Sequence, residues 1–157
     1  MNARFFTLIA LVSTTALAAP LPYDASADAK ADIRNAIVAA KTAQVPVLVI
    51  FGANWCEDCR ALDRALNSPG NRELIEREFK LVKVDVGRFN RNLDLAAAYG
   101  NPIKMGIPAA VVLSPGMEVL YATRAGELAD ARRMSESGIY DFFKGVTQAA
   151  REKALAH

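Results

Sequence analysis

The chain has 157 residues, 52% of them hydrophobic and 23% charged, which is an ordinary globular composition for one domain with one core. Its formal net charge of +2 is too small to indicate nucleic acid or an anionic membrane surface as a partner. A structural zinc site needs about four ligands. The chain has two cysteines and one histidine, the terminal His157, so no metal is expected.

The first residues have the pattern of a secretory signal peptide. Arg4 precedes an apolar run at 5–12, and Ala16-Leu17-Ala18 is a small-x-small cleavage signature. This run is shorter than the about 20 apolar residues of a membrane span, so no span is expected after cleavage. We therefore predict a signal peptide at 1–19, a mature domain at 20–157 and a periplasmic or secreted protein. The alternative is an ordinary N-terminal helix.

The first half of the mature chain alternates between helical and strand patterns. Asp28 is expected to cap a helix that ends before Val45-Pro46, because its apolar residues recur at helical spacing. Residues 47–51 form a continuous β-branched and aromatic run, which is typical of a strand buried on both faces. The elements expected here are helix 28–43, strand 47–51, a helix from about 56 to 66, a short helix 71–79 capped by Asn71, and strand 81–86.

The second half of the chain predicts a hairpin followed by a closing helix. Gly100 is a typical helix stop, and the polar residues around 114–117 favour a turn between two strands. The elements expected here are helix 92–99, a loop at 101–106, strands 109–113 and 118–122, a loop at 123–137, and a helix with the apolar stripe Ile139, Phe142, Phe143 and Val146.

The resulting order of elements is α-β-α-β-α-β-β-α. The first two strands are joined through a helix and are therefore expected to be parallel, whereas the last two form an antiparallel hairpin. The sequence thus predicts an α/β domain with a central mixed β-sheet of about four strands, flanked by helices.

The two cysteines, Cys56 and Cys59, lie just after the most buried strand, where the chain turns into a helix. The unpaired N–H groups and the dipole at a helix start favour a thiolate at Cys56, and Cys59 lies one turn further on. The pair can therefore exchange disulfides: Cys56 attacks, and Cys59 resolves the mixed disulfide. A disulfide over so short a gap adds little stability, so a role in redox chemistry is favoured.

At this point the sequence resembles a known family. Residues 51–60, Phe-Gly-Ala-Asn-Trp-Cys-Glu-Asp-Cys-Arg, resemble the thioredoxin active-site segment Phe-x-Ala-x-Trp-Cys-x-x-Cys. Gly106-Ile107-Pro108 resembles the family loop whose cis-proline packs beside the cysteines, and Gly126 matches a glycine common after the last strand. The resemblance covers about residues 28–150 and is closest to exported thioredoxin-like proteins. It implies a thioredoxin fold.

The resemblance implies a thiol–disulfide oxidoreductase that reduces or exchanges disulfides in exported proteins. Cys56 and Cys59 are the expected catalytic residues, and Trp55, Ile107 and Pro108 are expected to bind substrate. The expected partners are disulfide-containing proteins and an unidentified thiol electron donor. We expect a monomer that needs no cofactor beyond its redox-active disulfide. The alternative is a thioredoxin-fold binding module with a static disulfide, and the direction of the reaction stays open.

Two departures from the family pattern concern proton transfer and charge. Thioredoxins often have a buried acid near the end of the first central strand, and this chain has Ile50 at that position. Thioredoxins also have Gly-Pro between the two cysteines, and this chain has Glu57-Asp58 there. Glu57, Asp58 or water is therefore expected to handle protons, and the two acids to tune the pKa of Cys56. The remaining acids Asp85, Glu118 and Asp130 are interpreted as solvated surface, and Arg132-Arg133 as a loop charge pair.

Overall fold

The computed structural model describes residues 20–156, so the predicted signal peptide at 1–19 and His157 lie outside the described residues. Its strands are β1 (Val47–Gly52), β2 (Lys80–Asp85), β3 (Ala109–Leu113) and β4 (Val119–Ala122). Its helices are α1 (Ala29–Ala43), α2 (Glu57–Leu66), α3 (Pro69–Glu78), α4 (Leu93–Ala98) and α5 (Glu136–Leu155), with short 3-10 helices η1 (Pro102–Met105) and η2 (Ala131–Arg133). None of the helices in 20–156 has the length and apolarity needed to cross a membrane.

The sheet has four strands in the order β2-β1-β3-β4, with the apolar strand β1 inside it. β1 runs parallel to β2, with Val47 opposite Lys80, and antiparallel to β3, with Val47 opposite Leu113. β3 and β4 form the antiparallel hairpin. The predicted mixed sheet is confirmed, and the strand ends differ from the prediction by one residue at most.

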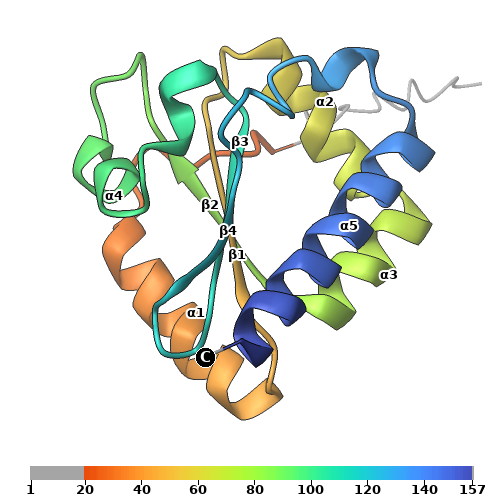
Figure 1. Ribbon diagram of the computed structural model, residues 1–157. Helices are drawn as coiled ribbons and strands as arrows, with labels where there is room; N and C mark the ends of the chain where they lie inside the picture. The colour runs from red at the N-terminus through yellow and green to blue at the C-terminus, as the bar shows by residue number, and fades with distance from the viewer. Residues whose placement is uncertain (1–19, 157) are drawn as a thin grey trace, which may run out of the picture.

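Helices cover both faces of this sheet, α1 and α4 on one side and α2, α3 and α5 on the other (Figure 1). Side chains of β1 alternate between two apolar clusters: Val49 and Phe51 face the first, whereas Leu48 and Ile50 face the second. Both cysteines belong to the first cluster. The site therefore lies at the C-terminal end of β1, where the chain passes into α2.

Helix starts agree with the prediction at Asp28 but not at Asn71. The Asp28 carboxylate accepts a hydrogen bond from the Ala31 N–H at 3.0 Å, as an N-cap does. α3 instead begins at Pro69, which suits a first helical turn because it lacks the N–H that would be unpaired there. Asn71 is buried and its Nδ2 donates to the carbonyls of Ala65 and Glu136, both at 3.0 Å, which ties α2 to α5.

The segment between β4 and α5, predicted to be a loop, contains η2 and packs against the loop that precedes β3. Gly126 lies at φ +74°, and a Cβ there would lie 2.9 Å from the carbonyl oxygen of Met105, so only glycine fits this close approach. The predicted loop at 101–106 likewise contains η1. These contacts bring η2 and the segment around Ile107 to the same end of the sheet as the cysteines.

Candidate active site

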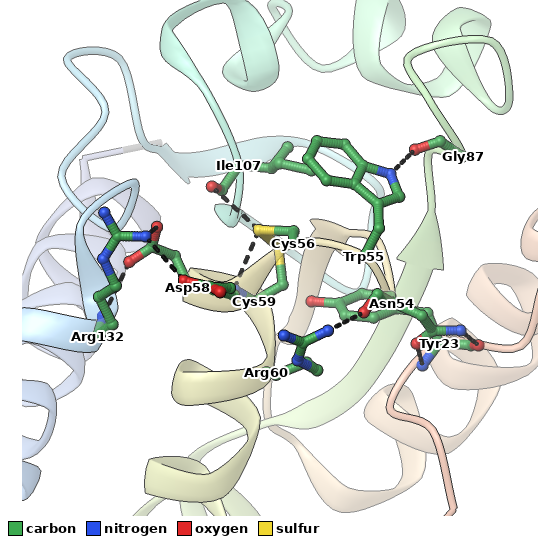
Figure 2. The surroundings of a disulfide bond; sticks show 11 residues. Tyr23, Asn54, Trp55, Cys56, Asp58, Cys59, Arg60, Gly87, Ile107 and Arg132 are labelled. Atoms are coloured by element: carbon green, nitrogen blue, oxygen red, sulfur yellow. Dashed lines mark hydrogen bonds and ion pairs between the residues drawn. A yellow bond between two sulfur atoms is a disulfide. The ribbon is translucent and has the colours of Figure 1, made fainter.

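Cys56 and Cys59 form a disulfide at the start of α2, with their Cα atoms 5.2 Å apart (Figure 2). Cys56 is the N-cap residue of this helix, so its sulfur lies where the backbone N–H groups are unpaired. The Cys59 N–H donates a hydrogen bond to Cys56 Sγ at 3.1 Å. The same N–H would stabilise a Cys56 thiolate in the reduced protein.

The two cysteines differ in burial, although even the more exposed of them is largely enclosed. Cys59 is fully buried, whereas Cys56 is 6% exposed. The backbone carbonyl of Ile107 covers Cys56 and lies 3.6 Å from its Sγ. The Ile107–Pro108 peptide bond is cis, as the family resemblance predicts. Attack from outside therefore reaches Cys56 before Cys59.

Trp55 forms an exposed apolar surface next to this sulfur and is not a core residue. Its side chain is 46% exposed, and its Nε1 donates to the carbonyl of Gly87 at 2.7 Å (Figure 2). The guanidinium of Arg88 lies 5.9 Å from the centre of the indole, and the Phe89 ring packs edge-on against it at 6.3 Å. Ile107 differs from Trp55 because its side chain is buried and only its backbone faces Cys56.

The two acids between the cysteines are held by an arginine that sequence analysis interpreted only as part of a loop charge pair. Arg132 in η2 lies 3.2 Å from the Glu57 carboxylate and 3.6 Å from that of Asp58. Its backbone N–H also donates to Asp58 at 3.0 Å. Arg133 instead pairs with Asp130 at 3.6 Å. Arg132 thus partly cancels the negative charge of the two acids beside Cys56.

Tyr23 is a second residue whose place in this site could not be predicted from the sequence. Its ring is buried, and its hydroxyl points toward the cysteine pair (Figure 2). Asn54 holds its backbone: the Tyr23 N–H donates to Asn54 Oδ1 at 3.0 Å, and Asn54 Nδ2 donates to the Tyr23 carbonyl at 2.6 Å. Tyr23 lies 31 residues from Asn54 in the chain. No local motif could have indicated this contact.

Two carboxylates act on the Tyr23 hydroxyl in addition to its burial. Burial raises the pKa of the Tyr23 hydroxyl above its usual range, and the carboxylates of Asp63 and Asp85 raise it further. Asp63 pairs with Lys83, and Asp85 lies 3.9 Å from Arg91. Asp85 was predicted to be solvated but is buried.

Gly52 is required because Tyr23 approaches the end of β1 closely. A Cβ at this position would overlap the Tyr23 hydroxyl and would lie 3.0 Å from Cys59 Sγ. We expect Gly52→Ala to lower the free energy of unfolding by about 1–3 kcal/mol through overpacking, measured by urea denaturation. The matched control is Gly145→Ala in the exposed middle of α5, where a Cβ meets nothing within 4 Å. That change should raise stability by about 0.5–1 kcal/mol, and equal effects of the two changes would contradict the prediction.

Among residues 20–156, no cluster of three or more histidine, cysteine or acidic side chains is arranged to hold a metal ion. The site brings together the two sulfur atoms of Cys56 and Cys59. A Cys-x-x-Cys disulfide at a helix start, beside a cis-proline and at the end of the central parallel strand, defines a protein of the thioredoxin fold.

Comparisons with known proteins agree with this class. The thioredoxin-like family matches residues 28–115. The disulphide isomerase from Xylella fastidiosa Temecula1 is 53% identical, with a TM-score of 0.81, and the match covers 83% of this chain and 99% of that chain. A search of curated proteins gives no match. The chain belongs to the thioredoxin-like family and is a homologue of that disulphide isomerase.

More distant solved structures share the fold. The oxidised C-terminal domain of DsbD from Neisseria meningitidis is 22% identical with a TM-score of 0.51, covering 75% of this chain and 96% of that one. A thioredoxin from Thermus thermophilus is 24% identical with a TM-score of 0.53, covering 73% of this chain and 81% of that one.

Proposed function

We propose that this protein is a thiol–disulfide oxidoreductase that reduces or exchanges disulfides in other exported proteins through Cys56 and Cys59. The observation that carries the proposal is the asymmetry of the pair. Cys56 Sγ accepts a hydrogen bond from the Cys59 N–H at the start of α2 and is slightly exposed, whereas Cys59 is fully buried. This arrangement gives one sulfur the role of nucleophile and the other the role of resolving thiol.

The reaction follows from these positions. The reduced Cys56 thiolate attacks one sulfur of a substrate disulfide, and the other substrate sulfur leaves with the electron pair and takes up a proton. Cys59 then loses its proton and attacks Cys56 Sγ, which breaks the mixed disulfide and releases the second substrate sulfur as a thiol. The substrate disulfide has been reduced and the Cys56–Cys59 pair oxidised. A thiol electron donor then restores the dithiol.

The surroundings of Cys56 support a protein substrate. Trp55 gives a flat apolar surface beside the sulfur, and the backbone of Ile107 lies at the site in the bend just before β3. An extended substrate segment could pair with this backbone like an added strand. The 53% identical relative is named a disulphide isomerase, which favours proteins as substrates. The signal-peptide pattern at 1–19 supports an exported, periplasmic location.

Catalysed reduction of insulin by dithiothreitol tests this proposal. We expect the wild-type protein to accelerate the precipitation of reduced insulin, and the double variant Cys56→Ser/Cys59→Ser to give only the uncatalysed rate. A wild-type rate equal to that of the double variant would favour the binding module with a static disulfide. Refolding of scrambled ribonuclease, run in parallel, shows whether disulfide rearrangement exceeds simple reduction.

A further inference from the structure

The resolving step requires Cys59 to lose a proton inside the core. Cys59 is fully buried, and a thiolate in apolar surroundings is unfavourable without a hydrogen-bond donor. Ile50, at the position of the family's buried acid, packs in the cluster on the other face of the sheet. Glu57 and Asp58 are engaged with Arg132 at the outer end of the site. The group that assists Cys59 must therefore be sought elsewhere.

The apolar cluster around Cys59 contains two hydroxyl groups, those of Tyr23 and Tyr99. The Tyr23 hydroxyl and Cys59 Sγ both lie beside the Cα of Gly52. A Cβ at Gly52 would overlap the hydroxyl and would lie 3.0 Å from the sulfur. Figure 2 shows this hydroxyl directed at the cysteine pair. The missing side chain of Gly52 thus leaves room for the phenol group on the side of β1 where the buried sulfur lies.

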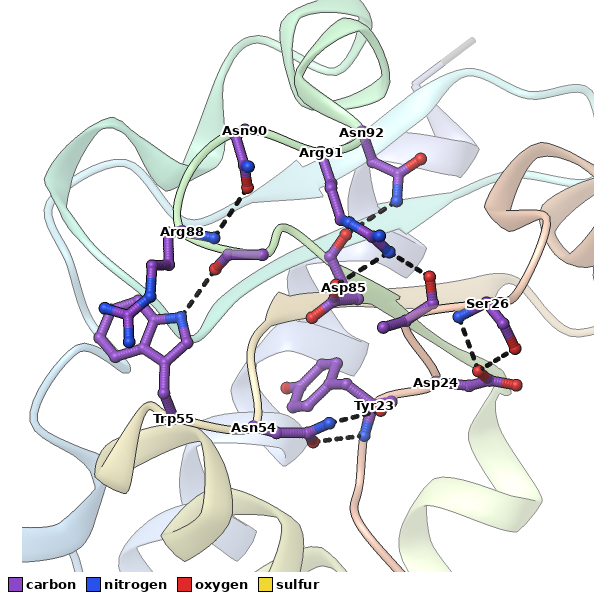
Figure 3. Close-up of polar contacts among 12 residues, drawn as sticks. Tyr23, Asp24, Ser26, Asn54, Trp55, Asp85, Arg88, Asn90, Arg91 and Asn92 are labelled. Carbon is purple, nitrogen blue, oxygen red and sulfur yellow. Dashed lines mark hydrogen bonds and ion pairs between the residues drawn. The ribbon is translucent and has the colours of Figure 1, made fainter.

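The placement of Tyr23 is fixed from two sides. Asn54, two residues before Cys56, makes two hydrogen bonds to the Tyr23 backbone, and the Arg60 guanidinium donates to the Asn54 carbonyl at 2.9 Å. Arg91 donates to the carbonyl of Ala25, just after Tyr23 (Figure 3). The segment that carries the tyrosine is therefore attached to the active-site turn itself.

We propose that the Tyr23 hydroxyl donates a hydrogen bond to the Cys59 thiolate and so accelerates resolution of the mixed disulfide. This inference rests on the proposed function and adds a residue to it. Because the raised pKa keeps the phenol neutral, Tyr23 acts as a donor and does not keep the proton. The proton that Cys59 loses is balanced by the proton that the departing substrate sulfur takes up.

The charged groups that face Tyr23 are the other groups whose protonation could change the pH dependence of the resolving step. These are Asp63 on α2 with its partner Lys83 on β2, and Asp85 at the end of β2 with Arg91 in the following loop. Both carboxylates have a cationic partner. If Tyr23→Phe shifts the pH midpoint of the resolving step, the shift can therefore be assigned to the lost hydroxyl.

The two chemical steps can be followed separately with dithiobis(nitrobenzoate) at one equivalent to the reduced protein. Attack by Cys56 releases one coloured thiolate, and attack by Cys59 on the mixed disulfide releases the second. In Tyr23→Phe we expect the second phase to be about tenfold slower near pH 7, with its pH midpoint about one unit higher, and the first phase unchanged. Tyr99→Phe, the same change in the same cluster, should leave both phases unchanged.

The outcomes separate this inference from the function on which it rests. Absence of a second phase in the wild-type protein would overturn the proposed function. A wild-type second phase that Tyr23→Phe leaves unaltered in rate and midpoint would overturn the role of the hydroxyl alone. Equal slowing of both phases, or slowing at all pH values without a midpoint shift, would also overturn it, because loss of packing would then explain the effect.

Discussion

We expect Cys56→Ser to abolish disulfide exchange and Cys59→Ser to capture substrates as stable mixed disulfides, the largest effect expected from a single substitution. Cys56 is at the helix start, accepts a hydrogen bond from the Cys59 N–H and is slightly exposed, so it should form the first bond to substrate. Without Cys59 the mixed disulfide has no internal thiol to resolve it. Turnover in the insulin assay should fall by more than about a thousandfold in both variants.

Non-reducing gel electrophoresis after incubation with a disulfide-containing protein distinguishes the two variants. Cys59→Ser should give a band at the summed mass that disappears on reduction, and Cys56→Ser should give none. The double variant Cys56→Ser/Cys59→Ser controls for non-covalent association. Equal trapping by both single variants would show that the buried Cys59 also reaches substrate, and the assignment of roles would then be wrong.

The elements of this fold could be predicted because their signals are local. The continuous apolar run at 47–51 predicts the central strand β1 by itself, and the Cys-x-x-Cys motif after it marks the start of α2. Asn71 was misinterpreted because asparagine is a good cap, and the competing start signal, a proline at the first helical position, comes just before it.

The missed parts of the site depend on contacts between distant segments. Tyr23 reaches the cysteines from the segment before α1, and Arg132 reaches Glu57 from η2, 75 residues away. Neither residue type is unusual where it stands in the sequence. Burial of Asp85 was missed for the same reason, because Arg91 and the Tyr23 segment enclose it only after folding. The sequence motif thus locates the pair of sulfur atoms, whereas the fold supplies the groups that surround it.

The pair should have a reduction potential nearer to the about −270 mV of thioredoxin than to the about −120 mV of the strongest oxidant. A strong oxidant needs a strongly stabilised thiolate in its reduced form. Here the helix start stabilises the Cys56 thiolate by about 0.3–1 kcal/mol. The carboxylates of Glu57 and Asp58 destabilise the thiolate, and Arg132 cancels part of their charge. The reduction potentials of thioredoxin and of the strongest oxidant differ by the equivalent of about 7 kcal/mol. Equilibration against dithiothreitol and glutathione buffers therefore distinguishes the two cases clearly.

Arg132→Ala tests the electrostatic part of this argument, because it leaves the two carboxylates uncompensated beside Cys56. A unit charge about 7 Å away changes the energy of a thiolate by about 0.6 kcal/mol in water and about 2.4 kcal/mol at an effective dielectric constant near 20. The variant should therefore be more reducing by about 10–50 mV, near the lower end because Arg132 is half exposed, and the shift should shrink in high salt. Arg133→Ala, which removes a neighbouring arginine paired with Asp130, should leave the potential unchanged. A wild-type potential near −120 mV, or equal shifts in the two arginine variants, would show that another interaction sets the thiolate energy.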